Sequence, residues 1–222
     1  MKFSWSYSAL KDFENCPRKY HEIRVLKNYQ VKKSEQILYG ESLHKAAEMY
    51  VKDGTPLPEQ FAFMQPIVDA LLTKNGEKHA EFQMALNHEL QPCGFFDKDV
   101  WVRGLADLLI IDHDENMAWV VDYKTGSNKY PDKSQLELMA LMVMTYFPNV
   151  VQVNGGLLFV VKGGLVKHKI RREEYDELWW KYKERVANIS AAKENNVWNP
   201  KQSGLCGWCE VNSCEFNPKH DA

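Results

Sequence analysis

The sequence lacks a strong excess of charge of either sign, and it has no long hydrophobic run. Its 222 residues carry a formal net charge of −2, with a pI near 6.4. Composition alone therefore gives no case for a nucleic-acid-binding protein, and any DNA groove has to be a local basic patch. No stretch approaches the length of a membrane span, and the first residues lack an apolar core of signal-peptide length. We expect a cytoplasmic protein without membrane association.

Cysteine is scarce, with five residues in the chain. In a reducing compartment these are not expected to form disulfides. Nucleotide-binding and calcium-binding loops are also missing. The Gly155-Gly156 and Gly163-Gly164 pairs are not followed by Lys-Ser/Thr and a helix, so no P-loop exists. The segment 112–123 begins like a calcium loop, but its sixth position is Met117 instead of glycine.

Hydrophobic residues make up 45% of the chain, enough to bury a sizeable core in one domain over residues 1–222. Periodicity and turn signals predict helices and strands that alternate along the chain. The strand at 117–124 is followed by a helix and then another strand, which favours a parallel crossover. The expected helices are 6–15, 39–51, 58–73, 132–147 and 173–195, and the expected strands are 80–90, 101–111, 117–124, 150–161 with a break at 154–156, and 165–170.

The chain is organised around the strand that ends in Asp122-Tyr123-Lys124 and the preceding strand that contains Asp107. Strand side chains alternate, so Asp122 and Lys124 point to one face. If the two strands form a hairpin centred between Asp114 and Glu115, Asp107 faces Asp122 with Cβ atoms roughly 5 Å apart. Two carboxylates this close repel unless a cation lies between them, and oxygen ligands suit magnesium or manganese. An ammonium beside that cation can position a water or stabilise charge on a phosphate. A buried Asp122–Lys124 ion pair with an unrelated Asp107 fits the positions equally well.

These residues resemble a known family. Gly104-x-x-Asp107, a short hairpin and Asp122-x-Lys124-Thr125-Gly126 resemble the metal-binding core of the PD-(D/E)XK nucleases, in their RecB-like branch. The opening Ser-x-Leu-x-x-Phe-x-x-Cys-Pro-x-Lys-Tyr, which ends at Tyr20, is similar to the start of RecB-like nucleases that carry an iron–sulfur cluster. The chain is thus similar to AddB nuclease domains and to CRISPR-associated adaptation nucleases. The resemblance implies an α/β, restriction-endonuclease-like core, with a central mixed sheet flanked by helices and the two terminal segments joined by the cluster.

The resemblance also implies roles for individual residues. Gly40-x-x-x-His44 on an early helix matches a metal-site imidazole, while Glu48 is expected to form an ordinary pair on the helix surface. Glu81 is the candidate for a glutamate beside the metal. Asp107, Asp122 and the backbone carbonyl of Tyr123 complete the metal ligands, and Lys124 is the catalytic lysine. In the family's Gln-x-x-x-Tyr motif this chain has Gln135 but Met139, and Tyr146 is a candidate to replace the tyrosine.

Three cysteines lie close together in the C-terminal tail at Cys-x2-Cys-x4-Cys. They are Cys206, Cys209 and Cys214, and three thiolates form an incomplete tetrahedral site. Spacing alone does not decide between an iron–sulfur cluster and zinc. With Cys16, they match the family pattern of one N-terminal and three C-terminal cysteines that hold a 4Fe–4S cluster. The cluster-binding segments are then 1–20 and 200–222, and Cys93 is left as an ordinary thiol.

The resemblance implies a Mg²⁺- or Mn²⁺-dependent DNA exonuclease that acts on single-stranded DNA from an end, in recombination, repair, replication or CRISPR adaptation. No helicase motif is present, so a stand-alone nuclease is expected. Two other readings stay open. One is a non-catalytic DNA-binding or assembly subunit with a retained nuclease fold; protein partners are possible but unknown. The other is a structural protein in which zinc joins the two ends of the chain, with a buried Asp–Lys pair.

Overall fold

The structure is a computed structural model that describes residues 3–129 and 131–220. It divides into two compact units. The first contains the described residues up to Ser4 together with Ser34–Trp179, and the second contains Trp5–Lys33 and the described residues from Trp180 onward. Residues 1–2 and 221–222 of the expected cluster-binding segments lie outside the described residues. No described helix is both long and apolar enough to cross a bilayer.

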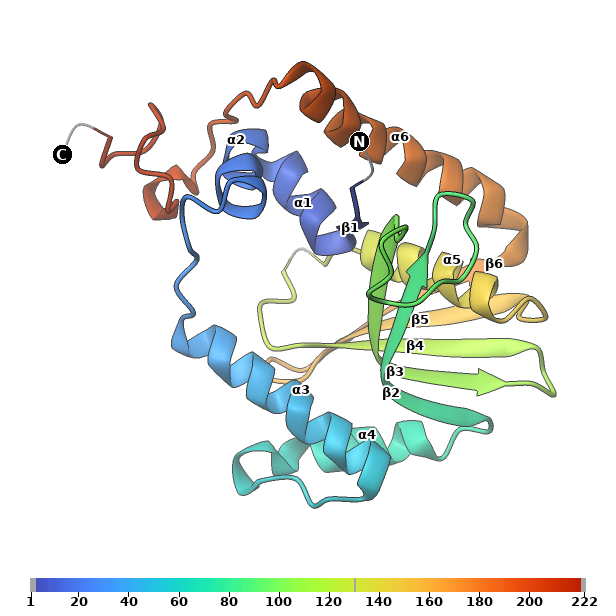
Figure 1. The fold of residues 1–222 in the computed structure, drawn as a ribbon. Coiled ribbons are helices and arrows are strands. Elements are labelled where there is room, and N and C mark those ends of the chain that lie inside the picture. The colour runs from blue at the N-terminus through green and yellow to red at the C-terminus, as the bar shows by residue number, and fades with distance from the viewer. Residues whose placement is uncertain (1–2, 130, 221–222) are drawn as a thin grey trace. The chain divides into compact units, whose positions relative to one another are not determined.

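The first unit is built on a mixed sheet. Its strands pair in sequence order, antiparallel except for the parallel pair β4–β5 that the crossover predicts. The mixed α/β architecture implied by the family resemblance is confirmed (Figure 1). The strands are β2 (Glu77–Leu86), β3 (Val102–Asp112), β4 (Met117–Lys124), β5 (Gln152–Phe159) and β6 (Leu165–Arg171).

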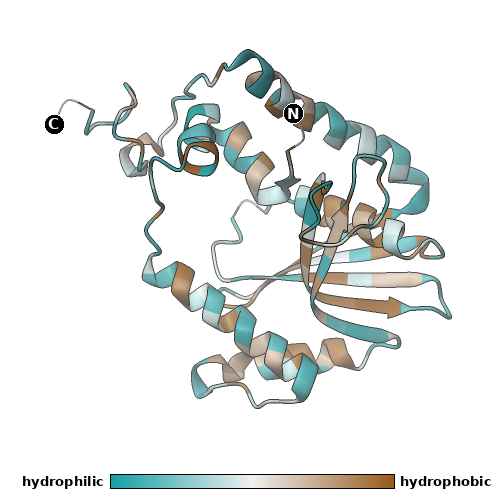
Figure 2. Ribbon diagram, in the orientation of Figure 1, coloured by the Kyte–Doolittle hydropathy of each residue, from teal (hydrophilic) through white to brown (hydrophobic). Residues whose placement is uncertain are grey.

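The β3–β4 hairpin has the register that its symmetry predicts. Pairs run from Asp112 opposite Met117 to Leu108 opposite Val121. Asp112 closes the turn, because its Oδ1 accepts the backbone N–H groups of Asp114 and Glu115 at 3.1 and 3.0 Å. The apolar strands flank this polar turn, as the hydropathy colours show (Figure 2). Asp107 and Asp122 come directly after the last pair of the ladder.

The predicted break at 154–156 is wrong, since β5 continues through Gly155 and Gly156. A Cβ on Gly155 would lie 3.0 Å from Cβ of Leu136, on the helix that covers this strand. The glycine therefore gives space to a packed helix instead of ending the strand.

Helices cover both faces of the sheet in the first unit. α3 (Glu35–Asp53) and α4 (Gln65–Leu72) pack on the face that carries Val121 and Tyr123, and α5 (Ser134–Tyr146) lies on the other face (Figure 1). α3 begins four residues earlier than expected because Ser34 caps it, and it ends at Gly54 with φ 67°. The single helix expected at 58–73 is a 3₁₀ helix, Glu59–Met64, followed by α4.

α5 is buried almost all round, and its residues Met139 and Met142 belong to the core. A Cβ on Gly104 of β3 would lie 2.7 Å from both Met139 Cε and Met142 Sδ. Met139 therefore occupies the tyrosine position of the family motif as a packing residue. The glycine lets the methionines approach the strand.

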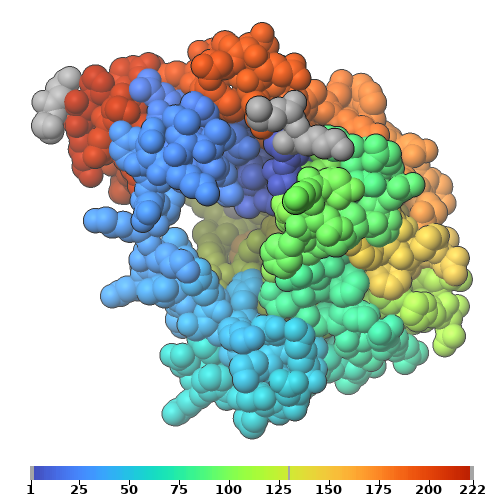
Figure 3. Space-filling view, in the orientation of Figure 1, coloured from blue at the N-terminus to red at the C-terminus, as the bar shows by residue number. Residues whose placement is uncertain are grey.

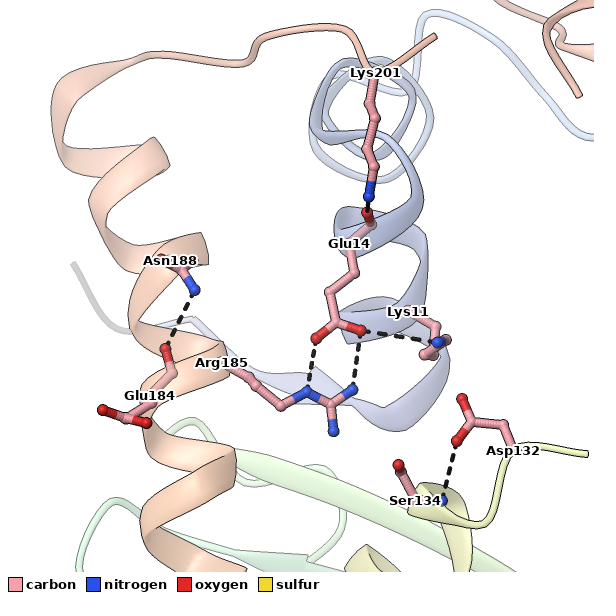
Figure 4. Close-up of polar contacts among 8 residues, drawn as sticks. All are labelled: Lys11, Glu14, Asp132, Ser134, Glu184, Arg185, Asn188 and Lys201. Carbon is pink, nitrogen blue, oxygen red and sulfur yellow. Dashed lines mark hydrogen bonds and ion pairs between the residues drawn. The ribbon is translucent and has the colours of Figure 1, made fainter. Parts of the chain in front are cut away.

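The second unit joins the two ends of the chain. It holds β1 (Trp5–Ser6), α1 (Tyr7–Asn15), α2 (Pro17–Tyr20), a π-helical turn at His21–Val25, the C-terminal tail and most of α6 (Tyr175–Asn195), which follows a 3₁₀ turn at Arg172–Glu174. Arg185 of α6 donates to both carboxylate oxygens of Glu14 in α1 at 2.7 and 2.9 Å (Figure 4). Lys201 of the tail donates to the Glu14 carbonyl at 2.9 Å, and Arg18 pairs with Glu215 at 2.8 Å.

Strand β2 contains an unusual residue. Glu81 has φ 52°, which lies in the left-handed region. Among the described residues other than glycine, it is the one strand residue with a positive φ. The β2–β3 pairing is interrupted there, between Ala80–Leu108 and Phe82–Ala106. A left-handed conformation costs an L-residue about 1–2 kcal/mol, and such strain concentrates at functional sites.

We predict that Glu81→Gly raises the free energy of unfolding by about 0.5–1 kcal/mol, because glycine adopts positive φ without this strain. Urea unfolding measures the change. The control is Gln83→Gly at an exposed position of the same strand, where glycine should cost about 0.5–1 kcal/mol. An equal loss of stability in both variants would show that Glu81 is not strained.

Candidate active site

Six elements or loops of the first unit surround one open cleft of about 760 Å³. α3 contributes His44, β2 Glu81, β3 Asp107, β4 Asp122 and α5 Gln135. The loop after β4 adds Thr125. A hollow between α3 and the strands β2 and β3 is visible in the space-filling view (Figure 3). The structure therefore brings together residues that are distant in the sequence, such as His44 and Gln135, which are 91 positions apart.

Asp107 ties three elements together. Its carboxylate is 8% exposed. Oδ2 accepts the backbone N–H of Tyr123 at 2.6 Å, and Oδ1 lies 3.2 Å from Nδ1 of His44. One carboxylate therefore fixes the end of β4 and the imidazole of α3 at the same time.

Asp122, Lys124 and Gln135 form a second group. Lys124 Nζ lies 2.7 Å from Asp122 Oδ2 and donates to Gln135 Oε1 at 2.8 Å. The amide nitrogen of Gln135 donates in turn to Asp122 Oδ1. The glutamine thus holds the carboxylate and the ammonium at once, and fixes the direction in which Lys124 points. The Asp122–Lys124 pair foreseen as the structural alternative is present, but within a larger cluster of acidic groups.

The acidic groups of the cleft disfavour each other's charge. Burial and the charge of Asp107 raise the pKa of Asp122 to about 6, although Lys124 opposes the shift. Burial and Asp107 also raise the pKa of Glu81. Burial works against a charged His44, but the hydrogen bond with Asp107 and the charges of the nearby acids outweigh it, so its pKa is raised. Excess negative charge of this kind is what a bound cation relieves.

Three of these side chains are placed to share one ion. His44, Glu81 and Asp107 each offer a ligand atom, and these atoms lie within 4.8 Å of one another. Asp122 stands outside this group because Lys124 and Gln135 hold its carboxylate. One nitrogen and several carboxylate oxygens are a donor set that fits a divalent cation such as Mn²⁺ or Mg²⁺.

Two expectations are settled by position. Tyr146 does not replace the missing tyrosine, because its hydroxyl donates to the Ala85 carbonyl and accepts the Ala85 N–H at 3.0 and 2.8 Å, on the backbone of β2. Glu48 does form the ion pairs expected on a helix surface, at 2.9 Å to Lys45 and 2.7 Å to Lys52. For Tyr123, the structure shows the backbone N–H bound to Asp107, and the role of its carbonyl stays a prediction.

Sequence reasoning missed the contact between α3 and the loop after β4. A Cβ on Gly40 would lie 3.2 Å from Oγ1 of Thr125, so the glycine gives the threonine hydroxyl room beside the cleft. Gln36 also lines the cleft. Gln36, Gly40 and His44 are four residues apart, and this helical spacing is the signal that would have identified the face.

The cysteines lie in two places. Cys16, Cys206, Cys209 and Cys214 line one cavity of about 110 Å³ in the second unit, and Cys93 belongs to the first unit. Backbone N–H groups of Lys19 and Lys201 approach Sγ of Cys16 at 3.5 Å, and that of Ser203 approaches Cys206 at 3.4 Å. Among the described residues, the one group of three or more side chains placed to share a metal ion is His44, Glu81 and Asp107, and no cysteine belongs to it.

Comparison with known proteins supplies the context for this site. The chain resembles a protein from Eubacterium rectale described as a "putative exonuclease", with a TM-score of 0.51 and 13% identity over 93% of this chain and 86% of that one. It also resembles the solved protein SSO0001, with a TM-score of 0.45 and 11% identity over 96% and 86%. The first likeness shows a shared fold. A search among curated proteins finds no match.

A family model covers almost the whole chain. The model of the PD-(D/E)XK nuclease superfamily matches residues 4–214, a range that includes both compact units. The matched range contains Asp107, Asp122 and Lys124 in the order that the family's name describes. The chain therefore belongs to the PD-(D/E)XK nuclease superfamily.

Proposed function

We propose that this protein is a Mg²⁺- or Mn²⁺-dependent deoxyribonuclease of the RecB-like iron–sulfur branch, an exonuclease that degrades single-stranded DNA from an end. The observation that carries the proposal is the placement of Lys124 and Asp122 beside the candidate metal group His44, Glu81 and Asp107. Exonuclease action is supported by the resemblance of the cysteine pattern and by the description of the Eubacterium rectale protein.

His44, Glu81 and Asp107 are the residues that we propose hold the cation, with Asp122 and the Tyr123 carbonyl as further ligands. Such an ion lowers the pKa of a bound water and offsets the charge of a phosphodiester. The protein's own contribution is to keep these acids together without it. The hydrogen bond from Tyr123 N–H and the contact with His44 hold Asp107 in place.

Lys124 is the residue that we propose acts on the attacking water. Its side chain is about one third exposed, and its ammonium is held by Asp122 and Gln135, which both line the cleft. A positioned ammonium can orient a water by hydrogen bonding, take part in moving its proton, and stabilise negative charge that develops on the phosphate. Gln135 is a positioning residue in this scheme.

We propose that Cys16, Cys206, Cys209 and Cys214 hold a 4Fe–4S cluster. Their shared cavity and the N–H groups directed at Cys16 and Cys206 support thiolate ligation, because hydrogen bonds to sulfur stabilise cluster ligands. A cytoplasmic location, where thiols stay reduced, agrees with this assignment.

The first prediction concerns Lys124→Ala. It should lower the rate of cleavage of end-labelled single-stranded DNA with Mn²⁺ by roughly 10²–10⁴-fold, because a positioned group that assists proton transfer contributes about that much. DNA binding in the presence of chelator should survive. The control is Lys45→Ala, which removes a largely exposed ammonium at the rim of the same cleft and should keep activity. Equal activity in Lys124→Ala and the parent would refute the assignment.

The second prediction concerns Asp122→Asn without metal. The pKa of Asp122 is about 6 in the folded protein against 3.8 for the free group, so the parent loses stability as pH rises through this window. The variant does not ionise. Above pH 6 it should be more stable by on the order of 1–3 kcal/mol, and below pH 4 the difference should vanish.

Urea unfolding at pH 4 and pH 7 in chelator measures the difference. Asp99→Asn, at an exposed position, is the control and should change little at either pH. Added Mn²⁺ should stabilise the parent more than Asp122→Asn if the carboxylate contributes to the metal site. A difference between parent and Asp122→Asn that does not depend on pH would contradict the prediction.

The third prediction concerns the cysteines. Protein purified without oxygen should contain iron, and Cys209→Ser should lose it together with resistance of the C-terminal tail to proteolysis, since the metal would tie the tail to Cys16. Cys93→Ser, in the other unit, should keep both properties. Elemental analysis and limited proteolysis make the comparison. Zinc in place of iron would favour the structural-clip alternative for this unit.

A further inference from the structure

A second groove lies on the first unit, on the face of β4 opposite to the active site. Asp122 and Lys124 point to one face of this strand, and Trp119 and Val121 line the groove on the other. Its volume is about 720 Å³, within the range of ligand sites. We call it the β6 groove. It is bounded by Ile67 and Leu71 of α4, by Lys74 just after that helix, by Asn154 and Gly156 of β5, and by Leu165, Lys167 and Lys169 of β6.

An aromatic ring and a glycine form the floor of the β6 groove. Trp119 packs against the hydrophobic core and is half-buried, so its indole is held in place with part of its surface accessible. The ammonium of Lys74 lies 4.9 Å from the centre of the ring. Gly156 has no side chain, and a Cβ there would lie 3.1 Å from Leu165. The floor therefore offers part of an indole ring with an ammonium over it.

The rim of the β6 groove is basic. Lys167 and Lys169 are exposed and two residues apart on the same face of β6, which separates them by about 6.7 Å along the strand. Within the described chain, no carboxylate lines the groove, and neither these two lysines nor Lys74 forms an ion pair. His168 between them pairs with Glu137 on the opposite face, at 3.4 Å.

The line of basic residues on this face of β6 continues beyond the groove. Arg171 follows on the same face of β6, and the Glu174 carboxylate accepts its backbone N–H. A line of cations beside a flat aromatic ring is the arrangement by which proteins hold single-stranded nucleic acid, with phosphates on the cations and bases on the ring. An acidic peptide would pair with the lysines alone, whereas a nucleic acid would also place a base against the exposed part of the indole.

We propose that the β6 groove binds a segment of single-stranded nucleic acid, with successive phosphates along Lys167 and Lys169 and one base stacked on Trp119. The inference deepens the proposed nuclease function, on which it rests for the identity of the strand. The groove makes no bond to the reacting phosphate. It holds a part of the strand that lies away from the cleavage site and so raises affinity for longer substrates.

The experiment measures fluorescence anisotropy of labelled oligo(dT) in chelator, so that no strand is cut. Lys167→Ala/Lys169→Ala should bind roughly tenfold more weakly than the parent. The slope of log K against log salt should become shallower by roughly 1.4, because each phosphate that a lysine no longer neutralises accounts for roughly 0.7. Lys98→Ala/Lys183→Ala removes two exposed charges elsewhere and should leave both quantities unchanged.

The role of the Trp119 indole is tested separately. Trp119→Leu keeps an apolar side chain but removes the stacking surface, so affinity should fall roughly tenfold while the salt slope stays that of the parent. A melting curve shows that each variant is folded. Binding by the lysine pair variant that equals the control in affinity and slope would overturn the proposal. So would equal displacement of the strand by oligo-glutamate or by dTMP at matched concentrations.

Different experiments test the nuclease proposal and the groove proposal, so one can be refuted without the other. Cleavage of a trinucleotide with Mn²⁺ tests the active site and should be normal in Lys167→Ala/Lys169→Ala but lost in Lys124→Ala. In chelator, Lys124→Ala should bind oligo(dT) as the parent does. A parent that cleaves while the groove variants bind normally refutes the groove alone. A parent that binds through the groove but never cleaves refutes the nuclease alone.

Discussion

The repulsion between buried carboxylates at the end of the β3–β4 ladder is the constraint on which the rest of the first unit depends. Asp107 and Asp122 are both more than nine-tenths buried, and neighbouring groups are arranged to tolerate them. His44 and the Tyr123 N–H take the oxygens of Asp107, and Lys124 and Gln135 take those of Asp122. Even so, the pKa of Asp122 stays raised. The site carries excess negative charge, and a bound cation would neutralise it.

The hairpin could be predicted from sequence because its determinants are local. A polar turn between two apolar strands sets the register, and the register sets which residues come together at the end of the ladder. The continuity of β5 could not be predicted in this way. Gly155 looks like a turn residue along the chain, and only Leu136, packed on it from α5, explains why glycine is needed inside a strand. Met139 presents the same problem, since its packing partner Gly104 is distant in sequence.

Glu81 marks the limit of sequence reasoning for the site itself. The family resemblance suggested a glutamate on this strand, but the left-handed backbone that interrupts β2 has no sequence signal, because glutamate is not a residue that favours it. Its carboxylate nevertheless joins His44 and Asp107 in the candidate metal group. A glycine would adopt this backbone conformation without strain, and strain of this kind is common at functional sites.

β4 shows how one strand can serve two surfaces. Its alternating side chains place Asp122, which lines the acidic cleft, and its partner Lys124 on one face, and Trp119 and Val121, which line the β6 groove, on the other. The two surfaces differ in charge, and this explains why a net charge of −2 is compatible with a nucleic-acid substrate. An acidic cleft repels a phosphate backbone until a cation is bound. In our two proposals, a basic groove on the same unit supplies the attraction that the acidic cleft lacks, and affinity and chemistry are carried by opposite faces of one sheet.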